Sequence, residues 1–169
     1  KGGGTLSFPV IDAILAEYDG LNAEVLENLL GDINVMGVHA ENGKVAVKLF
    51  ERSAPGEYAA ILMDIQMPIM DGLDAARTIR ALPREDAASI PIFALSASVF
   101  TADVERSLCS GMNGHLGKPV DIDQICSMLQ TWLYQQQTDI MNKLGDAGVF
   151  RYEREGLPPP TGPHVCAAA

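Results

Sequence analysis

The chain contains no long hydrophobic run, and this absence narrows its class. None of its apolar stretches approaches the roughly 20 residues that a bilayer-spanning helix requires, so we expect no membrane contact by this domain. The first residues, Lys1-Gly2-Gly3-Gly4, lead into no apolar segment of the signal-peptide type. We therefore expect a cytoplasmic protein in which residues 1–12 form a flexible N-terminal extension.

Basic residues are scarce as well. The chain has 12 Lys and Arg against 22 Asp and Glu, which gives a formal net charge of −10. Proteins that bind the phosphate backbone of DNA or RNA usually carry a basic stripe, and no such stripe is present. The composition therefore excludes direct nucleic-acid binding as a leading hypothesis.

Cysteine and several catalytic motifs are equally rare. The three cysteines, Cys109, Cys126 and Cys166, show no CxxC spacing, so a zinc site is not indicated. The first two fall within helical patterns, where a small half-buried thiol is more common than a disulfide. The glycines at 2–4 are followed by no Lys-Ser/Thr pair, which excludes a phosphate-binding loop there. No Ser-His-Asp triad is recognisable either.

What the chain does contain is a regular alternation of short apolar runs and amphipathic stretches between residues 13 and 133. Such alternation predicts a parallel sheet covered by helices on both faces. Residues 134–169 are first polar and then proline-rich, which predicts a linker or a partly ordered C-terminal extension. The predicted strands are 13–16, 34–39, 59–63, 90–95 and 114–117. The predicted helices begin near Asn22, Val45, Leu73, Thr101 (as the cap) and Asp121, and the last one extends to Leu133.

Polar side chains follow four of these apolar runs, where ligands of parallel sheets usually bind. Asp64 alone would more often be a turn-capping residue. Two more carboxylates, Glu17 and Asp19, follow the first run and are predicted to lie near Asp64. Clustered carboxylates need a cation such as Mg²⁺ to relieve their repulsion. Ser96 follows the fourth run and Lys118 the fifth, and both types of side chain bind phosphoryl oxygens. The set predicts a phosphoryl-transfer site.

Three stretches carry a resemblance to a known family. Residues 63–72 (MDIQMPIMDG) closely resemble the phosphoacceptor segment of response-regulator receiver domains, especially those attached to hybrid sensor histidine kinases. Residues 94–97 (ALSA) resemble the segment of the family that carries the switch hydroxyl, and residues 111–119 (GMNGHLGKP) resemble its lysine–proline segment. The resemblance extends from about Ala13 to Leu133, which identifies residues 13–133 as the receiver domain.

The resemblance implies a flavodoxin-like (βα)5 fold, a doubly wound parallel sheet with strand order 2-1-3-4-5. It implies that a histidine kinase or a histidine phosphotransfer protein donates a phosphoryl group to the domain. Partners, including a possible second copy in a homodimer, would bind the face formed by residues 101–133. Such a domain is not an enzyme beyond its part in its own Mg²⁺-dependent phosphorylation and dephosphorylation. It stands alone or belongs to a larger sensor kinase, which is often tethered to a membrane.

The resemblance also assigns roles within the site. Asp64 would be the phosphoacceptor, Ser96 and Lys118 would bind the phosphoryl group, and His115 would take the place of the switch aromatic residue. The Lys118–Pro119 bond is usually cis in the family. The implied ligands of Mg²⁺ are Glu17, Asp19, Asp64 and the backbone carbonyl of Gln66.

Two residues depart from the family pattern. Tyr18 stands where the second of two adjacent acids normally binds the metal, and a phenol is a poor Mg²⁺ ligand at neutral pH. Either a change of loop path lets Asp19 serve instead, or metal binding is weakened or lost. His115, in place of Tyr or Phe, is the second departure. The alternative hypothesis is therefore a pseudo-receiver that binds a partner without being phosphorylated. A flavodoxin is disfavoured because residues 17–20 are acidic rather than rich in Ser and Thr.

Overall fold

The computed structural model describes residues 10–97 and 100–144 of the chain, with side chains described as far as Leu133. Five strands form one parallel sheet in the order β2-β1-β3-β4-β5, and this confirms the predicted flavodoxin-like architecture. The elements are β1 (Ile11–Ala16), α1 (Gly20–Gly31), β2 (Val35–Ala40), α2 (Gly43–Arg52), β3 (Ala60–Asp64), α3 (Gly72–Arg80), β4 (Ile92–Ser96), α4 (Thr101–Cys109), β5 (Gly114–Gly117) and α5 (Ile122–Leu144).

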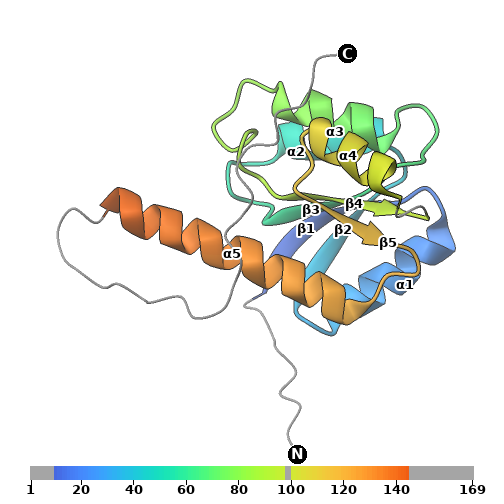
Figure 1. Cartoon of the computed structure of the whole chain (residues 1–169), viewed down its shortest axis with the longest axis horizontal. Coiled ribbons are helices and arrows are strands. Elements are labelled where there is room, and N and C mark those ends of the chain that lie inside the picture. The colour runs from blue at the N-terminus through green and yellow to red at the C-terminus, as the bar shows by residue number, and fades with distance from the viewer. Residues whose placement is uncertain (1–9, 98–99, 145–169) are drawn as a thin grey trace, which may run out of the picture.

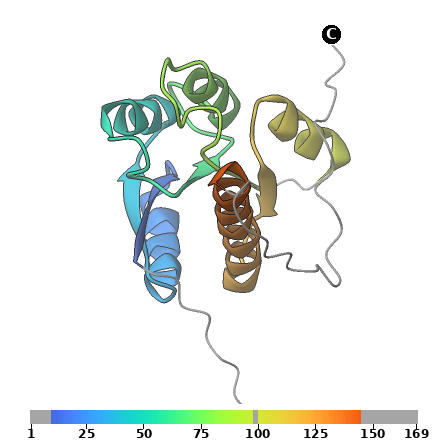
Figure 2. The same ribbon diagram turned by 90° about the vertical axis from the view of Figure 1, so that its left-hand side faces the viewer.

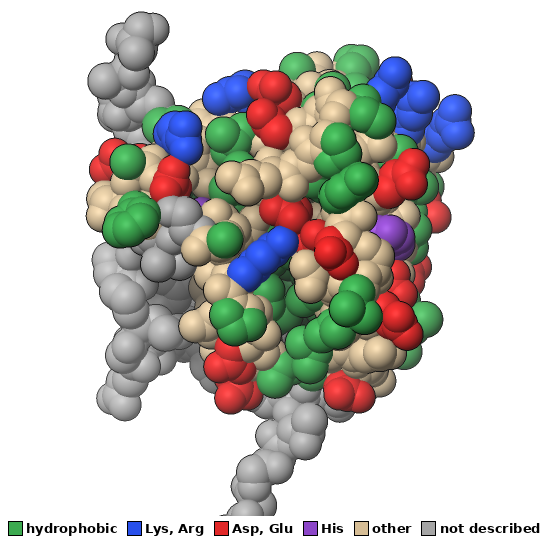
Figure 3. All heavy atoms as spheres, turned by 90° about the vertical axis from the view of Figure 1, so that its right-hand side faces the viewer, with side chains coloured by type: hydrophobic (Ala, Val, Ile, Leu, Met, Phe, Trp, Pro, Cys, Tyr) green, Lys and Arg blue, Asp and Glu red, His purple; other side chains and the backbone are tan. Residues whose placement is uncertain are grey.

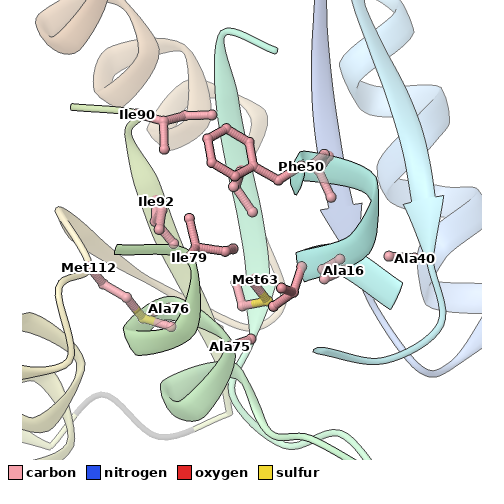
Figure 4. Close-up of a cluster of buried hydrophobic side chains, with 14 of the residues drawn as sticks. Ala16, Ala40, Phe50, Met63, Ala75, Ala76, Ile79, Ile90, Ile92 and Met112 are labelled. Atoms are coloured by element: carbon pink, nitrogen blue, oxygen red, sulfur yellow. The ribbon is translucent and has the colours of Figure 1, made fainter. Parts of the chain in front are cut away.

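The sheet is covered by helices on both faces (Figures 1 and 2). Successive side chains of a strand point to opposite faces, so each central strand contributes to two hydrophobic cores. One core lies between the sheet and helices α2 and α3 (Figure 4). The other lies under α1 and α5, where the rings of Phe93 and Trp132 approach to 6.3 Å between centroids. All five residues of β3 are buried, which explains its continuous apolar run.

Several boundaries differ from the prediction. Strand β1 begins at Ile11, and β4 begins after Pro91, which lacks the N–H that a ladder needs. Thr101 is the first residue of α4 and not its cap; the capping position is held by Phe100, whose side chain makes no capping bond. Helix α5 continues through residue 133, where the sequence predicts its end, to Leu144. Polarity alone does not end a helix, because Gln is a good helix former.

The two cysteines that lie within helices differ in state. Cys126 is a free, half-buried thiol as predicted, whereas Cys109 is disulfide-bonded, so the prediction of a thiol is wrong for Cys109. Among the helices that the structure describes, none has the length and apolarity that a membrane crossing needs. The predictions for residues 1–9 and 145–169 lie outside the described residues.

Candidate functional site

The strand register brings the predicted polar residues to one edge of the sheet. Ala16 pairs with Met63. The residues that come next, Glu17 directly after β1 and Asp64 at the end of β3, therefore lie side by side. Strands β4 and β5 end at the same edge, where Ser96 pairs with Gly117, the neighbour of Lys118. Figure 3 shows this face, on which a cationic side chain lies among acidic ones.

Lys118 joins the two acids directly. Its Nζ donates to Asp64 Oδ2 at 2.7 Å and to Glu17 Oε2 at 2.8 Å. The side chains of Asp64 and Glu17 are only 8% and 2% exposed. Burial of the Glu17 carboxyl raises its pKa, and the charge of Asp64 adds to this, although the bonds from Lys118 and from Asp19 N–H oppose it. Burial lowers the pKa of Lys118, but its bonds to Asp64 and Glu17 outweigh that effect and raise the pKa above its ordinary value. Lys118 is therefore a charged ammonium at neutral pH.

A tight loop after β3 fixes the position of Asp64. Asp64 Oδ1 accepts a bond from Gln66 N–H at 3.1 Å. Gly72 N–H closes the loop on Ile65 O at 2.9 Å, and a Cβ at position 72 would lie 2.2 Å from Asp64 O. Only glycine permits this approach, which accounts for the Asp-Gly pair that ends the motif.

The same loop contains a strained turn at Ile69. Met70 N–H donates to Pro68 O at 2.7 Å across Ile69, whose φ is +70°. A three-residue turn with positive φ is rare and costly for a β-branched residue. The side chain of Ile69 is 79% exposed, so burial against the described residues offsets little of this cost.

Glu17 is held by bonds to its main chain as well as to its carboxylate. Its N–H donates to Ala40 O at 3.0 Å, and its Oε1 accepts from Asp19 N–H at 3.1 Å. His39 Nε2 lies 2.7 Å from Glu17 O. Sequence reasoning did not find this role of His39, because the partner is a backbone carbonyl 22 residues away and leaves no pattern in the sequence.

Asp19 caps helix α1 in the structure. Asp19 Oδ1 accepts bonds from Leu21 N–H at 2.9 Å and Asn22 N–H at 3.0 Å, so this carboxylate caps helix α1. Tyr18 is 63% exposed. Within the described part of the chain, no group of three or more His, Cys, Asp or Glu side chains is arranged to hold a metal ion. Glu17 and Asp64 are thus brought together, and Asp19 is not brought to them.

The remaining predicted residues lie close to this pair. Ser96 ends β4 and is half-buried. His115 lies in β5, half-buried, with Nδ1 3.3 Å from Ser107 Oγ of α4. The Lys118–Pro119 peptide bond is cis, as the family resemblance predicts.

The donor set suits a hard divalent cation. Mg²⁺ in proteins is often held by one or two carboxylates together with water and substrate phosphate. Glu17 and Asp64 are two nearly buried carboxylates that bind one common cation, the Lys118 ammonium. A single ammonium leaves the pair with excess negative charge. Glu17 and Asp64 are therefore the side chains that would hold Mg²⁺.

Comparison with known proteins agrees with this geometry. The chain is 34% identical over 126 residues to the aerobic respiration control sensor protein ArcB of Escherichia coli. It is 31% identical over 137 residues to the hybrid signal transduction histidine kinase K of Dictyostelium discoideum. These matches cover 74% and 78% of the chain but only 15% and 11% of the two relatives, so the chain spans a small part of their length.

Two solved structures are similar in fold and sequence. One is the receiver domain of the sensor histidine kinase PA1611 of Pseudomonas aeruginosa, which has magnesium in its active-site cleft. It shares 35% identity at a TM-score of 0.66, over 73% of this chain and 98% of that one. The other is a co-crystal structure of the Saccharomyces cerevisiae phosphotransfer protein Ypd1 and the receiver domain of Ssk1. The identity there is 30% at a TM-score of 0.67, over 76% and 92% of the two chains.

A family model covers the same part of the chain. The model of the response regulator receiver domain matches residues 13–130, which span all five strands except the first two residues of β1. The match includes both acids that Lys118 joins and Lys118 itself. This chain belongs to the response regulator receiver domain family.

Proposed function

We propose that this domain accepts a phosphoryl group from a phosphohistidine on Asp64 and changes its partner-binding surface in response. The observation that carries the proposal is the ammonium of Lys118 bonded to Asp64 at the carboxyl edge of the sheet. Phosphoryl transfer requires mainly positioning and charge neutralisation, and these residues are placed to supply both.

The chemical step uses groups of the chain. A carboxylate oxygen of Asp64 attacks phosphorus, the bond from phosphorus to the donor histidine nitrogen breaks, and an acyl phosphate forms. The histidine leaves with the electron pair of the broken bond. Lys118 exchanges its bond to the carboxylate for one to a phosphoryl oxygen, and Ser96 is the hydroxyl group that donates to another.

We infer that Glu17, Asp64 and the backbone carbonyl of Gln66 would be the ligands of Mg²⁺. When bound, the ion neutralises charge on the phosphoryl oxygens during transfer. The magnesium in the PA1611 receiver supports this assignment. Asp19 uses Oδ1 to cap α1, and the described residues contain no metal-binding group of three that would unite it with Glu17 and Asp64, so we infer a site with two carboxylates. We expect its affinity for Mg²⁺ to be lower than that of a site with three.

The donor is a histidine kinase or a phosphotransfer protein. The hybrid kinases among the relatives and the Ypd1–Ssk1 complex support this choice. We infer that the domain works in the cytoplasm, signals through the face formed by residues 101–133, and takes part only in its own phosphorylation and dephosphorylation. A homodimer through that face remains a prediction.

The test is incubation with acetyl phosphate, with and without Mg²⁺, followed by measurement of the intact mass. The expected result is a Mg²⁺-dependent gain of one phosphoryl group of ~80 Da, absent from Asp64→Asn. No gain, together with no response to beryllofluoride, would instead support the pseudo-receiver that Tyr18 and His115 motivate.

A further inference from the structure

His39 supplies a hydrogen bond at the point where the backbone ladder between β1 and β2 ends. In the register of the two strands, Leu15 pairs with His39 and Ala16 with Ala40. The bond from Glu17 N–H to Ala40 O is the last one between the two backbones, since β2 then turns toward α2. The imidazole reaches one step further, with Nε2 2.7 Å from Glu17 O. Because a carbonyl only accepts, Nε2 carries the hydrogen and donates it.

The bond from His39 differs in kind from the other contacts that hold Glu17. Its carboxylate bonds to Lys118 and to Asp19 N–H, and both of these partners belong to the site itself. Lys118 has to move when a cation or a phosphoryl group arrives. The two bonds to β2, from Ala40 and from His39, come from a strand that takes no part in the chemistry. They are therefore the anchors that stay in place while the site changes.

We propose that His39 is a positioning residue of the site: its Nε2–H fixes the peptide that follows Glu17 and so preorganises the Glu17 carboxylate for a divalent cation. The inference rests on the proposed function, which makes Glu17 a ligand of Mg²⁺. Partners that orient a ligand from behind typically contribute about 10- to 100-fold to metal affinity. His39 is itself exposed, so its replacement leaves no cavity in either core.

Three variants separate the donated hydrogen bond from the bulk of the side chain. His39→Gln keeps an N–H donor at the ε position, His39→Asn keeps the amide but is one methylene shorter, and His39→Leu has no donor. Binding of Mg²⁺ is measured by calorimetry on the intact chain, and thermal unfolding checks that each variant is folded. Amide resonances of Glu17, Tyr18 and Asp19 are recorded in metal-free protein, so that one measurement is independent of metal.

We expect His39→Leu and His39→Asn to weaken Mg²⁺ binding by about tenfold, and His39→Gln to stay within about twofold of the natural protein. The amide signals of residues 17–19 should shift or broaden in the first two variants only. Equal Mg²⁺ affinity in all four proteins would overturn the inference, as would equal weakening in all three variants. Unmoved amide signals in His39→Leu would also overturn it. If the natural protein itself binds no Mg²⁺ and gains no phosphoryl group, the proposed function fails, while the metal-free amide signals still decide the role of His39.

Discussion

Two regions of the molecule hold partly buried cations, and they hold them differently. At the site, one flexible ammonium, Lys118, bonds to two carboxylates. At the connection between α3 and β4, the guanidinium of Arg80 donates to Gly111 O, Ala87 O and Asn113 Oδ1, all uncharged and 2.7–2.9 Å away. Nearby, Arg84 bonds to Asp86 and Phe50 O and lies 4.1 Å above the Phe50 ring.

Arg80 is a structural cation, whereas the contacts of Lys118 can be exchanged. Arg80 has a fixed oxygen for each branch of its planar fork, and burial lowers its pKa only to about 10, so it stays charged at neutral pH. Lys118 is a point charge between two acids that together exceed its charge, so a divalent ion or a phosphoryl group can take over its contacts. We infer that the first region secures the fold and the second is arranged for exchange.

The largest effect is expected for Lys118→Met. Loss of the ammonium should slow phosphorylation of Asp64 by about 100-fold or more, as loss of a charge-stabilising donor does in other active sites. The metal-free variant should also unfold more easily, because Glu17 and Asp64 then repel each other without a counter-ion, and Mg²⁺ should restore stability. Phosphorylation followed by intact mass, and urea unfolding with and without Mg²⁺, check both points. An unchanged rate would show that Lys118 is structural, like Arg80.

Arg80→Met should show the opposite profile. Removing the guanidinium takes the side-chain donor from the partly buried carbonyls of Gly111 and Ala87 and leaves Asn113 Oδ1 with Ile92 N–H alone, so we expect the free energy of unfolding to fall by about 3 kcal/mol. The rate of phosphorylation of the folded variant should remain near that of the natural protein. Arg77→Met is the matched control, because its pair with Asp74 is more than half exposed and contributes little. Urea unfolding gives the first quantity and acetyl phosphate labelling the second.

Glu17→Gln tests whether the acidic pair costs stability for the sake of function. We expect Mg²⁺ affinity to fall by about tenfold or more, since one of two charged ligands is lost. The metal-free variant should be as stable as the natural protein or more so, because a neutral amide avoids the cost of burying a second carboxylate next to Asp64. Calorimetric titration and urea unfolding provide the measurements. A large loss of stability would mean that Glu17 is chiefly a partner of Lys118.

The stability of the region around Arg84 and Asp86 should depend on pH. Burial raises the pKa of Asp86, but the bonds from Arg84 and Gly56 N–H outweigh it and lower the pKa below the ordinary value. A carboxyl group with a lowered pKa contributes stability above its ordinary pKa of 3.8, and that contribution is lost as the pH falls through the lowered value. Asp86→Asn should cost about 1–2 kcal/mol at pH 7 and progressively less as the pH falls below 3.8. Urea unfolding at a series of pH values would show whether the two curves approach each other.

The smallest effect on stability is expected from relieving the backbone strain at Ile69, in the loop that follows Asp64. Asn tolerates a positive φ better than a β-branched residue, so Ile69→Asn should raise the free energy of unfolding by up to about 1 kcal/mol. Ile65→Val offers a control in the same loop without a positive φ. If Ile69→Asn proves less stable than the natural protein, the exposed isoleucine has a packing partner that the described residues do not include.

Much of the fold followed from the alternation of apolar runs, because a strand buried on both faces leaves a continuous signal, as 60–63 does. Strand β5 was predicted with its observed bounds, Gly114–Gly117. Asp64, Ser96 and Lys118 were found because each is the last residue of a strand or comes directly after one. Helix ends were harder to place: α5 passes through a polar stretch without ending, and Thr101 begins a helix without capping it.

The acidic end of β1 could not be resolved from sequence. An aspartate three residues after a strand can bind metal or cap the next helix, and in the short loop to α1 Asp19 serves as the cap. His39 was missed for a different reason. Its bond joins a side chain to a backbone carbonyl across the two strands, so no spacing in the sequence reveals it.

The length of α5 gives the molecule a mechanical property. Its 23 residues form a rod of about 35 Å, which Figure 1 shows extending beyond the sheet on which it packs. Ile125 and Leu129, near its start, are buried against the strands that lead to Ser96 and Lys118. A tilt of about 10° at that contact would carry the far end, 15–19 residues away, through about 4–5 Å, given the helical rise. The helix therefore acts as a lever arm: its pivot lies in the core beside β4 and β5, and a small change of angle there displaces its far end more than its start.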